Sequence, residues 1–102
     1  MPEFLPAMRS PDLAEGSMTA MDVNGVHLLL ARIGGEVYAV SGTCTHEATD
    51  LGLGFMIEDR IVCPLHLSQF DLKTGQVMNP PAEVPLKRFN VKIEDETIFV
   101  EV

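Results

Sequence analysis

Two turn pairs, Asn24-Gly25 and Gly34-Gly35, constrain the fold of this chain more than any other feature of its sequence. They separate three runs rich in β-branched and apolar residues, which read SMTAMDV, VHLLLARI and EVYAV. Both residues of such a pair adopt positive φ in the tight turn that joins two antiparallel strands. The sequence therefore predicts a three-stranded meander between Gly16 and Ser41.

The C-terminal third continues in the same style. The stretch LKRFNVKIE from Leu86 predicts one strand, Asp95-Glu96 predicts a turn, and TIFVEV predicts the last strand. In that last strand Ile98 and Val100 alternate with Phe99 and Glu101, so one face is expected to be apolar and the other mixed.

Helical signals are weak throughout the chain. The best candidate is SPDLAEG, residues 10 to 16, where Ser10 would cap a single turn, Pro11 suits the first helical position and Gly16 would end it. Because no segment predicts a helix of three or more turns, the expected fold class is all-β.

The length and charge of the chain limit its organisation and partners. At 102 residues it is expected to form a single domain, residues 1–102, with a modest core. The net charge of -8 makes nucleic acid and anionic membranes poor partners and a basic protein surface a better one. The run VHLLLA is far shorter than the roughly 20 residues of a membrane helix. Since the first residues lack the basic and apolar pattern of a signal peptide, we expect a cytoplasmic protein.

Both cysteines and two of the three histidines lie close together, as Cys44-x-His46 and Cys63-x-x-His66. Buried, inert cysteines would be the simplest alternative, but this would leave their repeated pairing with histidine unexplained. Thiolates and imidazoles at such spacing suit zinc in a structural site or iron in a cluster. Zinc fingers commonly place both histidines last, on a helix, whereas here the order alternates and Pro64 disfavours a helix. One ligand of each type per pair fits a centre with two unlike metal ions.

Further motifs follow the two pairs: Phe70-Asp71, Thr74-Gly75 and the proline loop Asn79-Pro80-Pro81. Together with the strand GEVYAV before the first cysteine, they resemble the Rieske family in order and spacing over nearly the whole chain. Among its members, the chain is most similar to the small soluble Rieske ferredoxins of bacterial oxygenase systems. The resemblance implies a Rieske fold of stacked small antiparallel sheets, with a loop-built cluster-binding subdomain at about residues 42–85.

The same resemblance implies the ligands and the function. Cys44 and Cys63 would bind one iron of a Rieske 2Fe-2S cluster, and His46 and His66 the other. The chain would be a one-electron carrier rather than an enzyme. It would receive electrons from a flavoprotein or NADH-dependent ferredoxin reductase and pass them to a terminal oxygenase that hydroxylates aromatic rings.

Several positions depart from the respiratory members of the family, which add a disulfide between the loops and serine and tyrosine hydroxyls near the cluster. Thr49 and Leu65 stand at the disulfide positions, Ser68 keeps the serine, and Phe70 replaces the tyrosine. Leu67 stands where glycine commonly follows the second histidine. We therefore expect a reduction potential in the lower half of the Rieske range of roughly -150 to +300 mV.

Two alternative functions remain open at this level. One is a small Rieske-like subunit of a larger reductase, such as nitrite reductase, which would copurify with a large subunit. The other is a structural zinc module, which would be colourless and free of sulfide.

Other polar residues have simpler interpretations. His27 belongs to no cysteine pair and is expected to be a half-exposed strand residue rather than a ligand. Glu47, Asp50, Glu58 and Asp59 crowd the interval between the pairs, as in a solvated loop. Beside an exposed cluster, these acids would also steer a basic partner.

Overall fold

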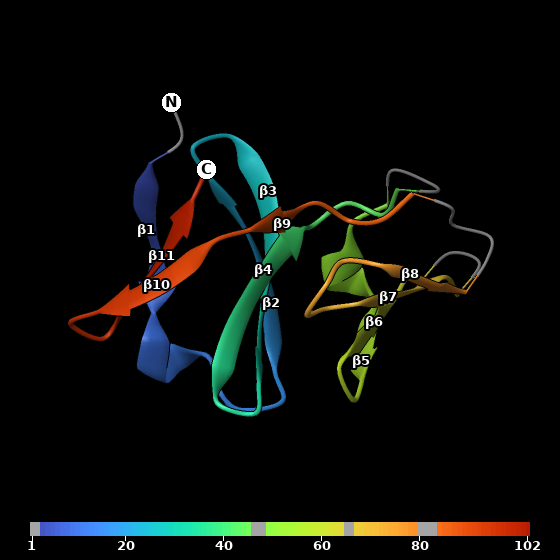
Figure 1. Cartoon of the computed structure of the whole chain (residues 1–102), viewed down its shortest axis with the longest axis horizontal. Coiled ribbons are helices and arrows are strands. Elements are labelled where there is room, and N and C mark those ends of the chain that lie inside the picture. Colours follow the sequence, from blue (N-terminus) through green and yellow to red (C-terminus); the bar gives the residue numbers. More distant parts are fainter. Residues whose placement is uncertain (1–2, 46–48, 65–66, 80–83) are drawn as a thin grey trace.

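The computed structural model describes residues 3–45, 49–64, 67–79 and 84–102. In these residues the chain forms three antiparallel sheets that lie side by side along the long axis (Figure 1). The terminal sheet has the order β1 (Phe4–Arg9), β11 (Thr97–Glu101), β10 (Val91–Glu94). The central sheet has the order β2 (Met18–Val23), β3 (Val26–Ile33), β4 (Glu36–Ser41), β9 (Arg88–Phe89). The short-strand sheet has the order β5 (Phe55–Ile57), β6 (Arg60–Val62), β7 (Gln69–Asp71), β8 (Val77–Asn79). The all-β fold class is thereby confirmed.

The predicted meander is the β2–β3–β4 part of the central sheet. Both turn pairs adopt positive φ, with 51° and 79° at Asn24 and Gly25 and 62° and 83° at Gly34 and Gly35. The first turn places Val23 opposite Val26, and therefore Asp22 opposite His27. This register matters for the site, because it fixes which side chains meet across the hairpin.

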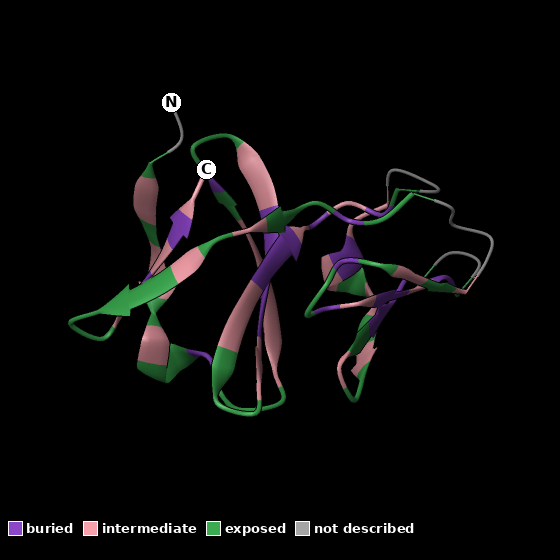
Figure 2. Ribbon diagram, viewed as in Figure 1, coloured by how far each residue is buried: buried purple, intermediate pink, exposed green. Residues whose placement is uncertain are grey.

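Strand β3 is buried on both faces, which explains why its apolar run is continuous rather than alternating. Leu28 and Leu30 pack with Ile98 and Val100 of the terminal sheet in one core. Leu29 and Ala31 face the other way, into a second core that includes residues of the short-strand sheet. Figure 2 shows this buried centre between exposed turns. The central sheet therefore separates two hydrophobic cores.

The expected strand from Leu86 is wrong in one respect, because the chain there forms two short strands in different sheets. β9 pairs with β4 of the central sheet, whereas β10 pairs with β11 of the terminal sheet. Asn90 lies between them, where its carbonyl accepts from the Glu101 N–H (2.9 Å) and its side-chain amide donates to the Glu101 carboxylate (2.9 Å). These bonds let the backbone cross from one sheet to the next.

The helix expected over residues 10–16 is shorter than predicted. A single 3-10 turn spans Ser10–Asp12, with Pro11 among its first positions as expected. Ser10 does not cap it, because Arg9 occupies that position and the Ser10 hydroxyl instead accepts a hydrogen bond from Arg32 (2.6 Å). The turn also ends well before Gly16.

Strand β1 adds to the expected strands, and its central Pro6 hides the strand pattern in the sequence. It pairs with β11, and the register shifts between Pro6 and Met8.

No helix within the described residues has the length and apolar character that crossing a membrane requires.

Candidate metal centre

Two loops beside the short-strand sheet are closed by the same backbone bond. In the first loop, residues 44–49, the Cys44 N–H donates to the Thr49 carbonyl at 2.8 Å. In the second loop, residues 63–68, the Cys63 N–H donates to the Ser68 carbonyl, also at 2.8 Å. Each loop thus begins with one of the cysteines, and each contains one of the predicted histidine ligands in its sequence.

The two cysteines are buried in one core. Cys44 is 2% exposed and Cys63 is fully buried, and both belong to the cluster that includes Ile61 and Phe70. Neither cysteine forms a disulfide. Two soft donors held in an apolar setting by matched loops fit an iron–sulfur cluster bound between the loops.

The predicted ligands His46 and His66 lie outside the described residues. The structure therefore brings together the two cysteines and the closed ends of both loops. Within the described ranges, no three histidine, cysteine or carboxylate side chains are grouped to hold a metal ion. The complete ligand set thus stays a prediction from the sequence.

The first loop is fixed where it meets the central sheet. Thr43 and Asp50 form an isolated antiparallel bridge, and the Leu51 N–H donates to the Gly42 carbonyl at 2.8 Å. A 3-10 helix, Leu51–Leu53, follows directly, and Asp50 caps it by accepting from the Gly52 N–H at 2.8 Å. Asp50 is therefore a structural residue of this loop and not only a solvated charge.

Both loops are also tied to the chain beyond them. The Thr45 hydroxyl donates to the Val84 carbonyl at 2.6 Å. The Gln69 N–H donates to the Asn79 side chain, also at 2.6 Å. These bonds join the loops to β8 and to the segment after it, which carries the predicted proline motif.

The departures from the respiratory proteins have distinct surroundings. Phe70 and Ser68 are fully buried, Phe70 within the core beside the cysteines. Leu67 is 58% exposed and has a φ of 58°, in the left-handed region that favours glycine. The backbone at this position therefore has the shape that suits the family's glycine, although the residue is leucine.

Exposed apolar side chains concentrate around this part of the molecule. Among the described residues, all but Ile93 of the exposed large apolar side chains lie between residues 53 and 84. They are Leu53, Phe55, Ile57, Leu67, Met78 and Val84. An apolar surface of this kind next to a metal site is typical of a protein contact.

His27 has a role that the sequence reading missed. Its Nδ1 lies 2.6 Å from Asp22 Oδ1, and its Nε2 lies 2.9 Å from Asp50 Oδ1. The hydrogen bond of His27 to Asp50, followed by its hydrogen bond to Asp22, raises the pKa of His27 above its usual value, while burial opposes this. The contact with Asp22 could have been found from the hairpin register, but that with Asp50 joins residues 23 positions apart.

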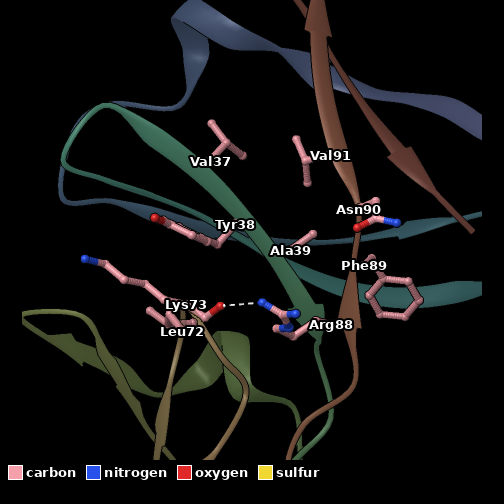
Figure 3. A pocket seen from close by; sticks show the side chains of 9 residues that line it. All are labelled: Val37, Tyr38, Ala39, Leu72, Lys73, Arg88, Phe89, Asn90 and Val91. Atoms are coloured by element: carbon pink, nitrogen blue, oxygen red, sulfur yellow. Dashed lines mark hydrogen bonds between the residues drawn. The ribbon is translucent and has the colours of Figure 1, made fainter.

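Two surface hollows lie on the β9 side of the molecule. One, of about 190 Å³, is lined by residues of β4, β9 and the β7–β8 turn, where Arg88 donates to the Lys73 carbonyl at 3.0 Å (Figure 3). The other, of about 440 Å³, is lined by Val26, Ser41, residues 87–90 and the last two residues of the chain. Neither cysteine lines either hollow, so these hollows do not hold a substrate against the loops.

Two matched loops that each begin with a buried cysteine, at one end of a small all-β stack, have the features of an iron–sulfur protein. Comparison with known proteins is consistent with this class. Residues 3–90 match the pattern of the Rieske [2Fe-2S] domain family. The chain belongs to this family.

Individual relatives are ferredoxins. The chain is 35% identical over 91 residues to the ferredoxin component of the naphthalene 1,2-dioxygenase/salicylate 5-hydroxylase systems of Ralstonia sp, covering 89% of this chain and 88% of that protein. It is 36% identical over 93 residues to the ferredoxin component of biphenyl 2,3-dioxygenase of Rhodococcus jostii, covering 91% and 87%.

Solved structures show the same similarity. A chain in the complex of reduced oxygenase and oxidized ferredoxin of carbazole 1,9a-dioxygenase superposes with a TM-score of 0.90 at 30% identity. The match covers 96% of this chain and 92% of that one. The protein is accordingly a ferredoxin-type electron carrier with a Rieske 2Fe-2S cluster, and not an enzyme.

Proposed function

We propose that this chain carries single electrons from a reductase to a terminal oxygenase, with Cys44, His46, Cys63 and His66 as the ligands of its cluster. The observation that supports the ligand set most strongly is the pair of matched loops, each closed from its cysteine to the fifth residue beyond. Both histidines fall inside these closed loops in the sequence. The single domain of residues 1–102 would then contain its cluster-binding subdomain at about residues 42–85.

The cysteines and the histidines would contribute differently to binding the cluster. The buried thiolates of Cys44 and Cys63 face an apolar core that keeps water from their side of the site. The imidazoles of His46 and His66 complete the set from the same two loops. The bound cluster supplies reversible one-electron chemistry at a potential tuned by its ligands and hydrogen bonds. The backbone hydrogen bonds that close the loops at Cys44 and Cys63 would keep the loops in place while the charge of the cluster changes.

The partners follow from the surface and from the relatives. The exposed apolar side chains near the loops provide a contact area, and the acidic chain favours a partner with a basic surface. The related ferredoxins serve naphthalene and biphenyl dioxygenase systems, which makes an aromatic-ring-hydroxylating oxygenase the proposed acceptor. The proposed donor is a flavoprotein or NADH-dependent ferredoxin reductase. We propose a cytoplasmic location, where thiols remain reduced.

Spectroscopy of the anaerobically purified protein tests the centre. We expect visible absorption, a rhombic EPR signal after reduction, and equal amounts of iron and acid-labile sulfide. Cys63→Ser should abolish all three, whereas Ser17→Ala, a change remote from both loops, should leave them intact. A colourless protein that contains zinc would support the structural module instead. Copurification with a large reductase subunit would favour the subunit alternative.

Stopped-flow reduction tests the partner surface. The rate at which a basic reductase reduces the ferredoxin should fall as ionic strength rises, because salt screens the attraction. A rate that is independent of salt would exclude electrostatic steering of this encounter.

A further inference from the structure

His27 links the central sheet to the far end of the first loop. It lies on β3, directly opposite Asp22 of β2. Its other ring nitrogen contacts Asp50, which closes the first loop through the bridge to Thr43 and caps the following 3-10 helix. The imidazole thus spans two carboxylates, one from the sheet and one from the loop.

The chemistry of this arrangement requires a charged imidazole. Each ring nitrogen faces a carboxylate oxygen, at 2.6 Å for Asp22 and 2.9 Å for Asp50. A neutral imidazole has only one N–H, so one nitrogen would present a lone pair to a carboxylate. The imidazolium donates to both carboxylates, and such charge-assisted bonds are stronger than neutral ones.

The loop also lies unusually close to the imidazole. The Gly42 N–H donates to the His27 carbonyl at 3.0 Å. A Cβ added at Gly42 would lie 2.5 Å from Cδ2 of the His27 ring, and one added at Gly52 would lie 2.6 Å from the Ala20 Cβ. The residues on either side of the first loop therefore approach the β2–β3 hairpin closely at Gly42 and Gly52, where a larger residue would displace its neighbours.

We propose that His27 is a positioning residue that fastens the first loop to the central sheet, with its imidazolium holding Asp50 and thereby the loop that begins at Cys44. The inference rests on the proposed function in taking Cys44 and His46 as cluster ligands. It assigns no ligand role to His27, whose two nitrogens are both engaged by carboxylates.

A window of pH follows from the groups that face His27. Among the described residues, the charged groups acting on it are Asp22 from β2 and Asp50, which directly follows the first loop. Because its folded-state pKa is raised above 6.5, the stabilisation from His27 is fully present below that value and is lost as pH rises through the raised pKa. The pKa of Asp50 is lowered, first by the His27 hydrogen bond and then by the Gly52 N–H. Its stabilisation is therefore lost only as pH falls through that lowered value.

The test is the rate of cluster release, followed as bleaching of the visible absorption in excess chelator, from about pH 5.5 to about pH 9. For the wild type we expect release to accelerate as His27 loses its proton. His27→Gln should release its cluster roughly three- to ten-fold faster near pH 6 and should lose most of this dependence on pH. Asp50→Asn should resemble His27→Gln.

Asp22→Asn is the matched control, because Asp22 contacts the same imidazole but not the loop. It should lower the pKa of His27 in an NMR titration of the imidazole, yet keep release near pH 6 within about two-fold of the wild type. A His27→Gln protein that releases its cluster at the wild-type rate near pH 6 would overturn the proposal. So would a wild-type His27 that titrates at or below its ordinary pKa.

Failure of the proposed function would look different. If the purified protein held no cluster, the ligand assignment would fail, while the fastening of the loop would still be measurable. Thermal unfolding of wild type and His27→Gln against pH would then be compared. The difference in melting temperature between the two proteins should vanish at alkaline pH if His27 holds the loop. A difference in melting temperature that is independent of pH would contradict that role. If His27→Gln did not fold, Asp50→Asn and the NMR titration would decide.

Discussion

The central sheet and the short-strand sheet are built from the same antiparallel pairing but hold together in different ways. Strands β2, β3 and β4 have 6, 8 and 6 residues, whereas β5 to β8 have 3 residues each. The central strands carry tight turns and lie between two cores. The short-strand sheet carries three of the exposed large apolar side chains among the described residues, namely Phe55, Ile57 and Met78.

The two regions therefore have different sources of stability. Long ladders and a buried strand can fold without a metal, while short strands joined by loops need an additional crosslink. The cluster proposed to lie between the two loops would provide that crosslink. The central sheet therefore serves as the platform, and the short-strand sheet depends on what it binds.

Removing the cluster tests this comparison most severely. After chelation under reducing conditions, we expect amides of β5 to β8 and of both loops to lose their protection in hydrogen exchange, while those of β2 to β4 keep theirs. Mass spectrometry of proteolytic fragments measures both regions in one experiment. Equal loss of protection in the two sheets would show that the platform also depends on the metal.

Substitutions on the two faces of β3 separate the contributions of the two cores to stability. Leu30→Ala and Leu29→Ala should each lower the free energy of unfolding of the cluster-bound protein by about 2–5 kcal/mol, because each leaves a cavity in a filled core. In the cluster-free protein, Leu30→Ala should keep its full effect, since its core is built from the central and terminal sheets and includes no described residue of the short-strand sheet. Leu29→Ala should lose much of its effect, because Phe70 and its neighbours loosen. Denaturant titrations of both forms measure this, and identical losses in the cluster-free protein would contradict it.

Ser68→Ala probes the second loop, where this buried serine occupies the position of the respiratory hydroxyl. Loss of one hydrogen bond of about 1 kcal/mol to the reduced cluster corresponds to a potential lower by about 40 mV for one electron. Protein-film voltammetry measures this value. Ser17→Ala, in the platform region, is the matched control and should leave the potential unchanged. An unchanged potential in Ser68→Ala would remove the hydroxyl from the tuning of the cluster.

The smallest effect is expected at Leu67. A leucine at a φ of 58° is strained by about 1–2 kcal/mol, while glycine costs more chain entropy on folding. Leu67→Gly should therefore stabilise the cluster-bound protein by at most about 1 kcal/mol, and Leu67→Val should destabilise it by a similar amount. Asn24 in the β2–β3 turn has a φ of 51°. The change in the free energy of unfolding caused by Asn24→Val therefore gives the cost of a β-branched residue at positive φ in the central sheet. Denaturation in urea measures all three, and a stabilising Leu67→Val would contradict the strain.

Much of the platform could be predicted from local signals. The turn pairs Asn24-Gly25 and Gly34-Gly35 delimit their strands, and Asp95-Glu96 marks the last hairpin, where both residues adopt positive φ. Strand β1 could not be predicted, because it exists only through its pairing with β11 at the other end of the sequence. The break at Asn90 is equally nonlocal, since the partner changes there from β4 to β11.

The metal site shows a similar limit. The spacing of Cys44 and Cys63 with their histidines was readable because ligand chemistry restricts the residue types. The closure of both loops by equivalent backbone hydrogen bonds could not be predicted, since these bonds do not depend on which side chains the residues carry. The contact of His27 with Asp50 needed the position of the loop on the sheet, which only the folded chain supplies.

The described ends of the chain meet in the terminal sheet, where Glu3 and Val102 exchange two backbone hydrogen bonds of 3.1 Å. This sheet and the short-strand sheet occupy opposite ends of the long axis (Figure 1). A tag or tether attached after Val102 would therefore leave the loop end of the molecule uncovered. Immobilised on an electrode in this way, the protein would present its loops to a partner in solution, whereas direct exchange with the electrode would have to cross the length of the molecule.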